Sequence, residues 1–344
     1  TSTTTPDSTT TRTTREGLHV TSDVVQGEGL VGLPEIEAAA RRLQGVAVPT
    51  PLLPSESVSE AVGATVRLKC ESLQRAGSFK LRGAFNFVSQ LSDDQVRNGI
   101  ITYSSGNHAQ AVALAGRLRG VRAVVVMPTT APKVKVRGAE ALGAEVHFEG
   151  TTSVERKARA EEIAAEEGLV VVPPFDHRHI IAGQGTVGYE IARAWSDVDL
   201  VLVPIGGGGL ASGVAASVKR MVPKARVIGV EPEGAASMRA ALDAGRPVKL
   251  DRIDTIADGL APVIAGQLTF EHARDLMDDV VTVTDDAIRE ATSLLVGRQK
   301  LIVEYSGAAT TAALLSGKVD AEGLSVAVVI SGGNLDPSLL SELF

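Results

Sequence analysis

LVLVPIGGGGLASG, residues 200–213, is the stretch that decides the fold of this chain. It opens with a run of apolar residues, which is typical of a strand buried on both faces of a parallel sheet. Four glycines follow, and small residues then continue at a spacing that predicts a helix. In open α/β sheets, ligands collect at the carboxyl ends of strands, where loops lead into helix N-termini. The stretch therefore predicts an α/β fold with a ligand site at residues 206–209.

The same alternation of strand and helix extends outward from this stretch, from about Leu33 onward. Short apolar runs predict strands at 65–69, 100–103, 121–127, 145–148, 170–172, 200–204, 226–230 and 325–330. Apolar residues three and four positions apart predict helices at 81–91, 108–119, 132–142, 154–167, 185–195, 210–221 and 286–300. Alternating elements of this kind predict a parallel α/β architecture.

Composition narrows the class of protein. The 344 residues suffice for about two domains. A net charge of −7, with acids and bases interspersed, favours a soluble protein and excludes a nucleic-acid partner. The longest apolar stretches, such as 123–127, are far shorter than the roughly 18 residues of a membrane span, so no membrane association is expected. The single cysteine, Cys70, excludes an internal disulfide and is expected to be a small buried hydrophobe.

The beginning of the chain differs from the rest. Its first fifteen residues, TSTTTPDSTTTRTTR, carry almost no apolar side chains and cannot offset the entropy cost of ordering. We therefore expect residues 1–30 to form a disordered tail. Since no apolar signal-peptide core follows, a cytoplasmic protein is expected.

The glycine loop itself predicts the kind of ligand. Glycines let backbone amides approach a phosphate closely. A dinucleotide site would need the spacing G-x-G-x-x-G, and a triphosphate loop would end in Lys-Ser/Thr, and neither pattern is present. A single phosphate monoester is therefore the favoured ligand, and the alternative is a flexible glycine turn.

A lysine occupies the start of a predicted helix in GSFKLRGA, residues 77–84. The helix dipole and partial burial both favour the neutral amine of Lys80. A neutral lysine can condense with an aldehyde and later act as a base. An isolated lysine of this kind would more often be an ordinary surface charge, so the case for Lys80 depends on the other motifs.

Two further motifs follow predicted strands. In ITYSSGNHAQA, residues 101–111, hydroxyls, an amide and free backbone amides suit a carboxylate at a helix N-terminus. The simpler alternative is an N-cap by Ser105 or Asn107. In VAVVISGGN, residues 326–334, Ser331 ends a buried strand and can hydrogen-bond a ring nitrogen. Alone, its Ser-Gly-Gly would indicate only a turn.

Together these motifs resemble those of the fold type II, or β-family, pyridoxal-phosphate enzymes, and within them the threonine/serine dehydratase and serine racemase branch. The family pattern S-F-K-x-R-G-A matches residues 78–84, and S-S-G-N-H-A/G-Q matches 104–110. Cysteine-synthase relatives usually carry S-G-N-T in the second motif, and threonine synthase carries S-F-K-D-R-G in the first. Leu81 and His108 therefore favour the dehydratases. The similarity extends from about Leu33 to the end of the chain.

The resemblance implies a fold and a domain organisation. The fold class is α/β, with two open, mainly parallel twisted sheets flanked by helices, like the tryptophan synthase β subunit. After the tail, residues 31–98 and 176–344 would form the large cofactor-binding domain, and residues 99–175 the small domain. A homo-oligomer, either a dimer or a tetramer, is the family expectation.

The resemblance also assigns roles to residues. Lys80 would hold pyridoxal 5'-phosphate as a Schiff base and then act as the base for the α-proton. The other expected cofactor contacts are Phe79 on the ring face, Asn107 at the ring hydroxyl, Gly206, Gly207, Gly208, Gly209 and Leu210 at the phosphate, Ser331 at the ring nitrogen, and Gly259. The expected substrate-binding residues are Ser104, Ser105, Asn107 and His108. A neutral Ser331 keeps the ring a weaker electron sink than an aspartate would, which favours β-elimination over transamination.

The implied function is β-elimination, that is dehydration and deamination, of L-threonine and/or L-serine to a 2-oxo acid and ammonia by an ammonia-lyase. Ser105 stands where serine racemase has its opposite-face acid/base, so a racemase is the alternative. Tyr305 replaces a family proline in VEYSGA, residues 303–308, and is expected to reshape the cofactor's far wall, so 3-hydroxyaspartate is an alternative substrate. A different class, a non-catalytic binder of a phosphorylated ligand, also stays open.

A metal site is not predicted. Glu231 in VEPEGA, residues 230–235, matches the first carboxylate of the racemase cation site. Ser237 stands where that family has an aspartate, which leaves too few oxygen ligands for a divalent cation. Glu231 is therefore only a weak candidate, and a charge at a helix start is the other interpretation.

Overall fold

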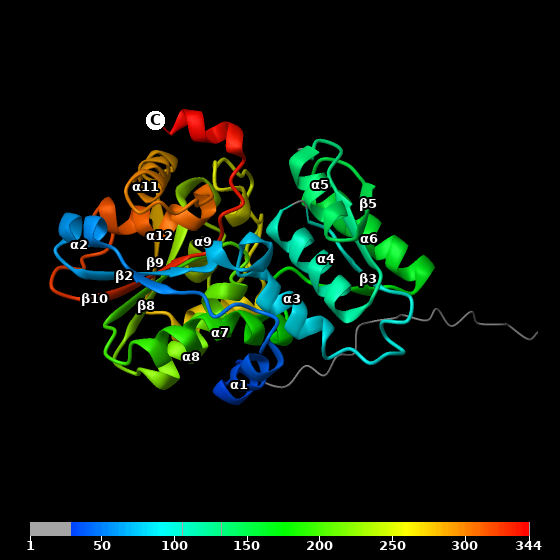
Figure 1. The fold of residues 1–344 in the computed structure, drawn as a ribbon, viewed down its shortest axis with the longest axis horizontal. Coiled ribbons are helices and arrows are strands. Elements are labelled where there is room, and N and C mark those ends of the chain that lie inside the picture. The colour runs from blue at the N-terminus through cyan, green and yellow to red at the C-terminus, as the bar shows by residue number, and fades with distance from the viewer. Residues whose placement is uncertain (1–28, 105, 132, 344) are drawn as a thin grey trace, which may run out of the picture.

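The computed structural model describes residues 29–343 apart from Ser105 and Pro132. Almost all of the predicted tail, residues 1–30, thus lies outside the described residues, as does the candidate Ser105. The described chain forms two lobes, each built around its own sheet (Figure 1).

The larger sheet has six strands in the order β1-β2-β10-β7-β8-β9. Their bounds are β1 Leu52–Pro54, β2 Thr65–Cys70, β7 Leu200–Pro204, β8 Arg226–Pro232, β9 Asp279–Val283 and β10 Ser325–Ile330. All neighbours pair in parallel except β1, which runs antiparallel to β2 at one edge. The smaller sheet is wholly parallel, in the order β5-β4-β3-β6, with β3 Ile100–Thr102, β4 Ala123–Met127, β5 Ala144–Phe148 and β6 Val170–Val171.

Twelve α-helices of the described residues cover these sheets. They are α1 Leu33–Arg42, α2 Glu56–Val62, α3 Lys80–Val88, α4 Asn107–Arg119, α5 Lys133–Ala141, α6 Ser153–Glu167, α7 Arg178–Ala194, α8 Gly209–Met221, α9 Ser237–Ala244, α10 Gln267–Leu276, α11 Asp285–Gly297 and α12 Tyr305–Leu315.

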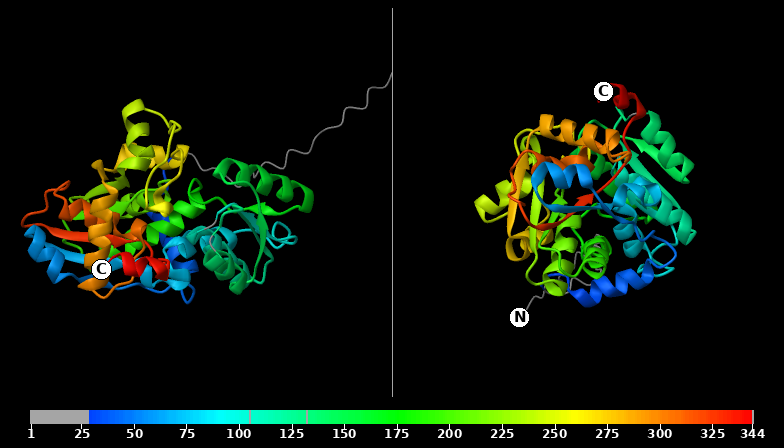
Figure 2. Two further views of the ribbon diagram at one scale, coloured as in Figure 1. Left: turned by 90° about the horizontal axis from the view of Figure 1, so that it is seen from above. Right: turned by 60° about the vertical axis from the view of Figure 1, so that its left-hand side comes forward.

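Side chains of the central strands alternate between two cores, because successive residues of a strand point to opposite faces of the sheet. In β7, Leu200 and Leu202 pack with residues of α11 and α12, whereas Val201 and Val203 pack with residues of α7 and α8. The small sheet is likewise covered by α6 on one face and by α4 and α5 on the other. Helices thus flank both faces of both sheets (Figure 2).

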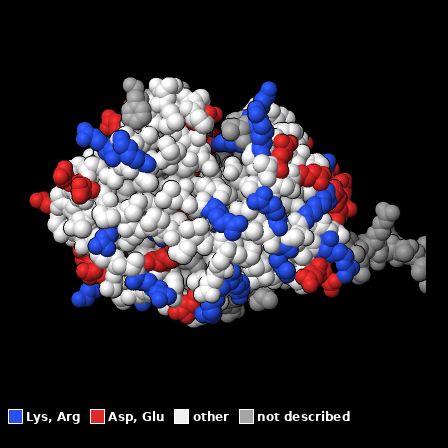
Figure 3. Space-filling view, in the orientation of Figure 1, with Lys and Arg blue, Asp and Glu red and all other residues white. Residues whose placement is uncertain are grey.

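The predicted fold class is confirmed, and each predicted strand and helix has a counterpart in the structure. The division into domains stays a prediction, although the strands of the small sheet all lie between residues 100 and 171. Cys70 ends β2 and is fully buried. Within the described residues, no helix is both long enough and apolar enough to cross a membrane. Basic and acidic side chains are interspersed on the face shown in Figure 3.

Candidate active site

A cavity of about 480 Å³ lies between the two lobes. All predicted cofactor- and substrate-binding residues that the structure describes line it: Phe79, Lys80, Ser104, Asn107, His108, Gly206, Gly207, Gly208, Gly209, Leu210, Gly259 and Ser331. The sequence analysis did not predict other lining residues, among them Tyr103, Lys135, Arg156, Pro174, Phe175, Asp258, Glu304, Ser306 and Asn334. The structure therefore brings the four motifs together, while the role of each residue stays a prediction.

The topology explains this convergence. Strand β10 lies between β2 and β7, and all three are parallel, so their carboxyl ends meet at one edge of the sheet. The segment after β2 leads to Lys80, the segment after β7 is the glycine loop, and Ser331 directly follows β10. The loop after β3 adds Ser104 from the small lobe. Carboxyl ends of parallel strands are where α/β proteins bind ligands.

Lys80 is the first residue of α3 and points into the cleft, where its Nζ donates a hydrogen bond to the carbonyl oxygen of Pro174 at 2.9 Å. Desolvation lowers the pKa of Lys80 to about 8, against the opposing effect of the Glu304 carboxylate. An appreciable fraction of the amine is therefore neutral near neutral pH. Such an amine can attack a carbonyl and can accept a proton.

Arg82 anchors the helix that carries Lys80. Its guanidinium is buried and donates to both oxygens of Glu71, at 2.8 and 2.9 Å, and to Glu190 at 2.6 Å. The two carboxylates raise the pKa of Arg82 against the effect of burial. Because Glu71 follows β2 and Glu190 belongs to α7, these bonds tie α3 to both elements. Arg82, the arginine of S-F-K-x-R-G, therefore fixes the position of helix α3 and with it the position of Lys80.

The glycine loop forms a cradle whose first three positions, 206–208, have no room for a side chain. Gly208 has a φ of +93°, and a Cβ there would lie 2.7 Å from Cβ of Thr269. A Cβ on Gly206 would lie 2.9 Å from the carbonyl oxygen of Gly259, and one on Gly207 would overlap the ring of Phe175. Helix α8 begins at Gly209, so unpaired backbone amides face this cradle. Its shape and its amides fit a phosphate group.

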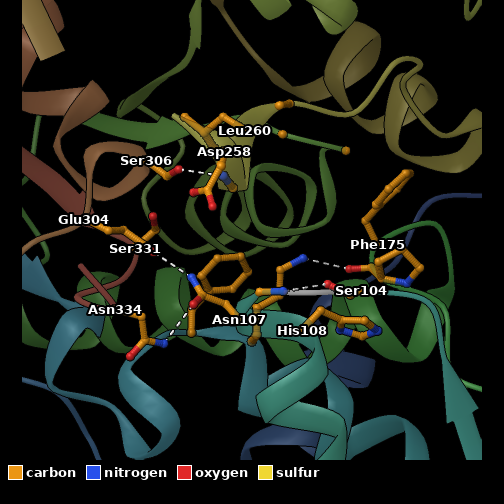
Figure 4. Close-up of a pocket in the computed structure, with 18 of the residues that line it drawn as sticks. Ser104, Asn107, His108, Phe175, Asp258, Leu260, Glu304, Ser306, Ser331 and Asn334 are labelled. Carbon is orange, nitrogen blue, oxygen red and sulfur yellow. Dashed lines mark hydrogen bonds between the residues drawn. The ribbon is translucent and has the colours of Figure 1, made fainter. Parts of the chain in front are cut away.

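Asn107 is held between two side chains of the large lobe (Figure 4). Its Nδ2 donates to Oε1 of Glu304 at 2.6 Å, and its Oδ1 accepts from Nδ2 of Asn334 at 2.8 Å. Glu304 is buried, and its pKa is raised to about 7 by desolvation and by the neighbouring Asp258. Ser331, also buried, lies nearby with a neutral hydroxyl.

Glu304 could have been noticed in the sequence, because it stands in the VEYSGA segment beside Tyr305. The structure shows that Glu304 and Ser306 line the cleft, whereas Tyr305 packs in the core of the large lobe. The influence of Tyr305 on substrate choice therefore stays a prediction. Any such influence would act through Glu304 and Ser306.

His108 is a neutral imidazole in this site. It is buried, its Nε2 lies 3.2 Å from the carbonyl oxygen of Val172, and desolvation together with the charge of Lys80 lowers its pKa to about 3. Because Nε2 faces an acceptor, it carries the proton, and Nδ1 is left with a lone pair. His108 thus offers no donor from Nδ1, and a carboxylate here would depend on Ser104 and on the amides that begin α4.

Burial of neutral His108 predicts an acid-sensitive fold. A histidine with a depressed native pKa stabilises the protein above its unfolded pKa of about 6.5, and this contribution is lost as the pH falls toward 3. Between pH 7 and pH 5 the free energy of unfolding should drop by roughly 2 kcal/mol more in the wild type than in His108→Asn. Urea unfolding at the two pH values measures this difference, and equal drops would contradict the assignment.

Glu231 lies away from the cleft. Its two carboxylate oxygens accept hydrogen bonds from the backbone amides of Met238 and Arg239, both at 2.8 Å, at the start of α9. Burial nevertheless raises its pKa to about 7. These bonds to the start of α9 agree with the alternative interpretation, while a cation role of Glu231 stays an untested weak candidate. The described residues contain no group of three or more His, Cys, Asp or Glu that could hold a metal ion.

Known proteins share this chain's sequence and fold. Residues 43–332 match a family described as pyridoxal-phosphate dependent enzyme. The chain is 42% identical to the L-threonine ammonia-lyase of Thermotoga maritima, over 91% of this chain and 78% of that protein. It is 41% identical to the catabolic L-threonine dehydratase TdcB of Escherichia coli, over 95% and 98%. The structure of maize serine racemase superimposes with a TM-score of 0.88 at 38% identity, covering 91% of this chain and 97% of that one.

Proposed function

The chain belongs to the family of pyridoxal-phosphate-dependent enzymes, and on this premise we propose that it is an ammonia-lyase that converts L-threonine and/or L-serine to a 2-oxo acid and ammonia. The observation that carries the proposal is the position of Lys80. Its partly neutral amine shares one cleft with a glycine cradle that fits a phosphate. The threonine ammonia-lyase and dehydratase relatives supply the substrate class.

The described residues fit the cofactor. Lys80 would hold its aldehyde covalently, residues 206–209 would hold its phosphate, and Ser331 would face its ring nitrogen. When bound, pyridoxal phosphate supplies an electron sink for the negative charge that develops on the substrate Cα. Lys80 then has a second task, since an amine with a pKa near 8 can take the α-proton at neutral pH.

Product analysis tests the proposal. The purified holoenzyme is incubated with L-threonine, L-serine, D-serine and 3-hydroxyaspartate, and the oxo acid and the chirality of the remaining amino acid are measured together. We expect 2-oxobutanoate from L-threonine and pyruvate from L-serine. Racemisation without any oxo acid would refute the dehydratase. If the protein is colourless and does not take up pyridoxal phosphate, the remaining hypothesis is a non-catalytic binder of a phosphorylated ligand.

Serine racemase is the second candidate, because the maize enzyme has the same fold over nearly the whole chain. By the resemblance to serine racemase, Ser105 would supply the proton donor opposite Lys80 that racemisation needs and elimination does not. We expect Ser105→Ala to lower any serine racemisation by about 100-fold and to change oxo-acid formation by less than about threefold. Chiral chromatography of the serine pool, with a pyruvate assay on the same samples, measures both. Equal loss of both activities would contradict this role.

We further propose a cytoplasmic location and a homodimer or homotetramer, both on the family expectation. Light scattering of the purified protein measures the assembly directly, and a monomeric mass would contradict it.

A further inference from the structure

Hydrogen bonds connect the two lobes beside Lys80. Asn107 is the first residue of α4 in the small lobe, and its partners Glu304 and Asn334 belong to the large lobe (Figure 4). Asn334 is fixed in turn, since its Nδ2 also donates to the carbonyl oxygen of Ala76 at 2.9 Å. Gly332 packs against this contact, because a Cβ there would overlap Oε1 of Glu304 and lie 3.1 Å from Nδ2 of Asn107. The three side chains therefore form a close-packed group.

The two partners determine which way the amide of Asn107 points. A glutamate carboxylate only accepts hydrogen bonds, and Nδ2 of Asn334 only donates them. The nitrogen of Asn107 must therefore face Glu304, and its oxygen must face Asn334. A flipped amide would set acceptor against acceptor and donor against donor, and both bonds would be lost. In the observed orientation, the second N–H of the Asn107 side chain is free to donate a hydrogen bond to a ligand in the cleft.

The ionised carboxylate of Glu304 gives the stronger bond, because hydrogen bonds to a charged acceptor exceed neutral ones. The charged groups that act on Glu304 are Lys80 of α3 and Lys135 of α5, which favour its ionised form, and Asp258, which disfavours it. Burial and Asp258 together raise its pKa to about 7. At a pH above this pKa, the Glu304 carboxylate is a charged hydrogen-bond acceptor. At a pH below it, the carboxylic acid is neutral and its O–H can also donate a hydrogen bond.

We propose that Glu304 is a positioning residue, which fixes the side-chain amide of Asn107 as a hydrogen-bond donor toward the cofactor and so sets how tightly the cofactor is held. The proposal rests on the proposed function, because it places pyridoxal phosphate at Lys80. Glu304 acts through Asn107, so its effect must depend on the presence of that side chain.

A double-mutant cycle on cofactor affinity tests this dependence. The dissociation constant of pyridoxal phosphate is measured by titrating the apo forms of wild type, Glu304→Gln, Asn107→Ala and the double variant at pH 8, with the visible absorption band as the signal. We expect Glu304→Gln to weaken binding about 10-fold in the wild-type background and less than about twofold in the Asn107→Ala background. An effect of full size in both backgrounds would overturn the proposal, as would unchanged affinity of Glu304→Gln.

The pH dependence of cofactor affinity separates a positioning role of Glu304 from a merely structural one, which would not depend on the charge of Glu304. At pH 6, where Glu304 of the wild type is largely protonated, the ratio of the two dissociation constants, Glu304→Gln over wild type, should fall toward 1. A ratio that is the same at pH 6 and pH 8 would contradict the role of the carboxylate.

Two further variants complete the design. Asp336→Asn removes a carboxylate that also lines the cleft but bonds to Ser338, so it should leave the affinity unchanged. If Glu304→Gln fails to fold, Glu304→Asp draws the carboxylate back by one methylene from Nδ2 of Asn107 and should weaken binding about threefold, and unchanged affinity would then overturn the proposal. A wild type without a visible band would instead refute the proposed function, so the two failures are distinguishable.

Discussion

Lys80→Ala is expected to abolish both the visible absorption band of the holoenzyme and the formation of 2-oxo acid, with kcat for L-threonine lowered by at least about 10⁴-fold. The variant loses the amine that would hold the cofactor aldehyde and the base that would take the α-proton. Two tasks are removed by one substitution, so the effect should exceed that of any substitution among the cleft residues that hold the cofactor by hydrogen bonds alone.

Two matched variants separate the loss of the reactive amine of Lys80 from the loss of its positive charge. Lys80→Arg keeps a cation at the start of α3 but cannot condense with an aldehyde, so it should lose the band as completely as the alanine variant. Lys135→Ala removes the other lysine that lines the cleft, which pairs with Asp258, and should retain the band. A band at unchanged wavelength and intensity in Lys80→Ala would show that another amine holds the cofactor.

The sequence predicted those parts of the site that belong to recognisable motifs in the segments that follow strands. Lys80, the glycine loop and Ser331 each belong to a motif whose glycines or hydroxyls break the apolar pattern. Glu304 and Asn334 join the site through tertiary contacts with Asn107, which is 197 residues from Glu304 and 227 from Asn334. The segments that carry Glu304 and Asn334 can be recognised in the sequence, but their contacts with Asn107 cannot, since these contacts arise only when the two lobes meet.

Helix α12, which the sequence analysis missed, and helix α7, which it predicted only in part, show the limits of periodicity. In α12 every residue from Tyr305 to Leu314 is buried, so no polar face exists to mark a helical period. Helix α7 begins at Arg178, seven residues before the predicted start at 185. Gly183 lies in the part of this helix that was not predicted, and a Cβ there would lie 2.5 Å from the carbonyl oxygen of Arg82. That glycine lets α7 pack closely against α3.

The second substitution for which we expect a large effect is Gly207→Ala. It should raise the dissociation constant of pyridoxal phosphate at least about 100-fold. The new Cβ would lie 2.2 Å from two ring carbons of Phe175, far inside van der Waals contact. Relief of this clash would require the side chain or the backbone of Phe175 to move, and that backbone packs closely against Gly209. Its displacement would also shift Pro174, whose carbonyl accepts the hydrogen bond from Lys80.

Gly209→Ala is the matched control, because it adds the same methyl group two residues later in the same loop. Its Cβ would meet Phe175 at 3.1 Å, a contact that a shift of a few tenths of an ångström relieves, and it lies in the first turn of α8 without a positive φ. We expect its dissociation constant to stay within about fivefold of the wild type. Titration of the apo proteins measures both, and urea unfolding shows whether each folds. Equal affinities for the two variants would mean that the loop adapts freely, and the cradle would then owe its affinity to the amides at the start of α8 alone.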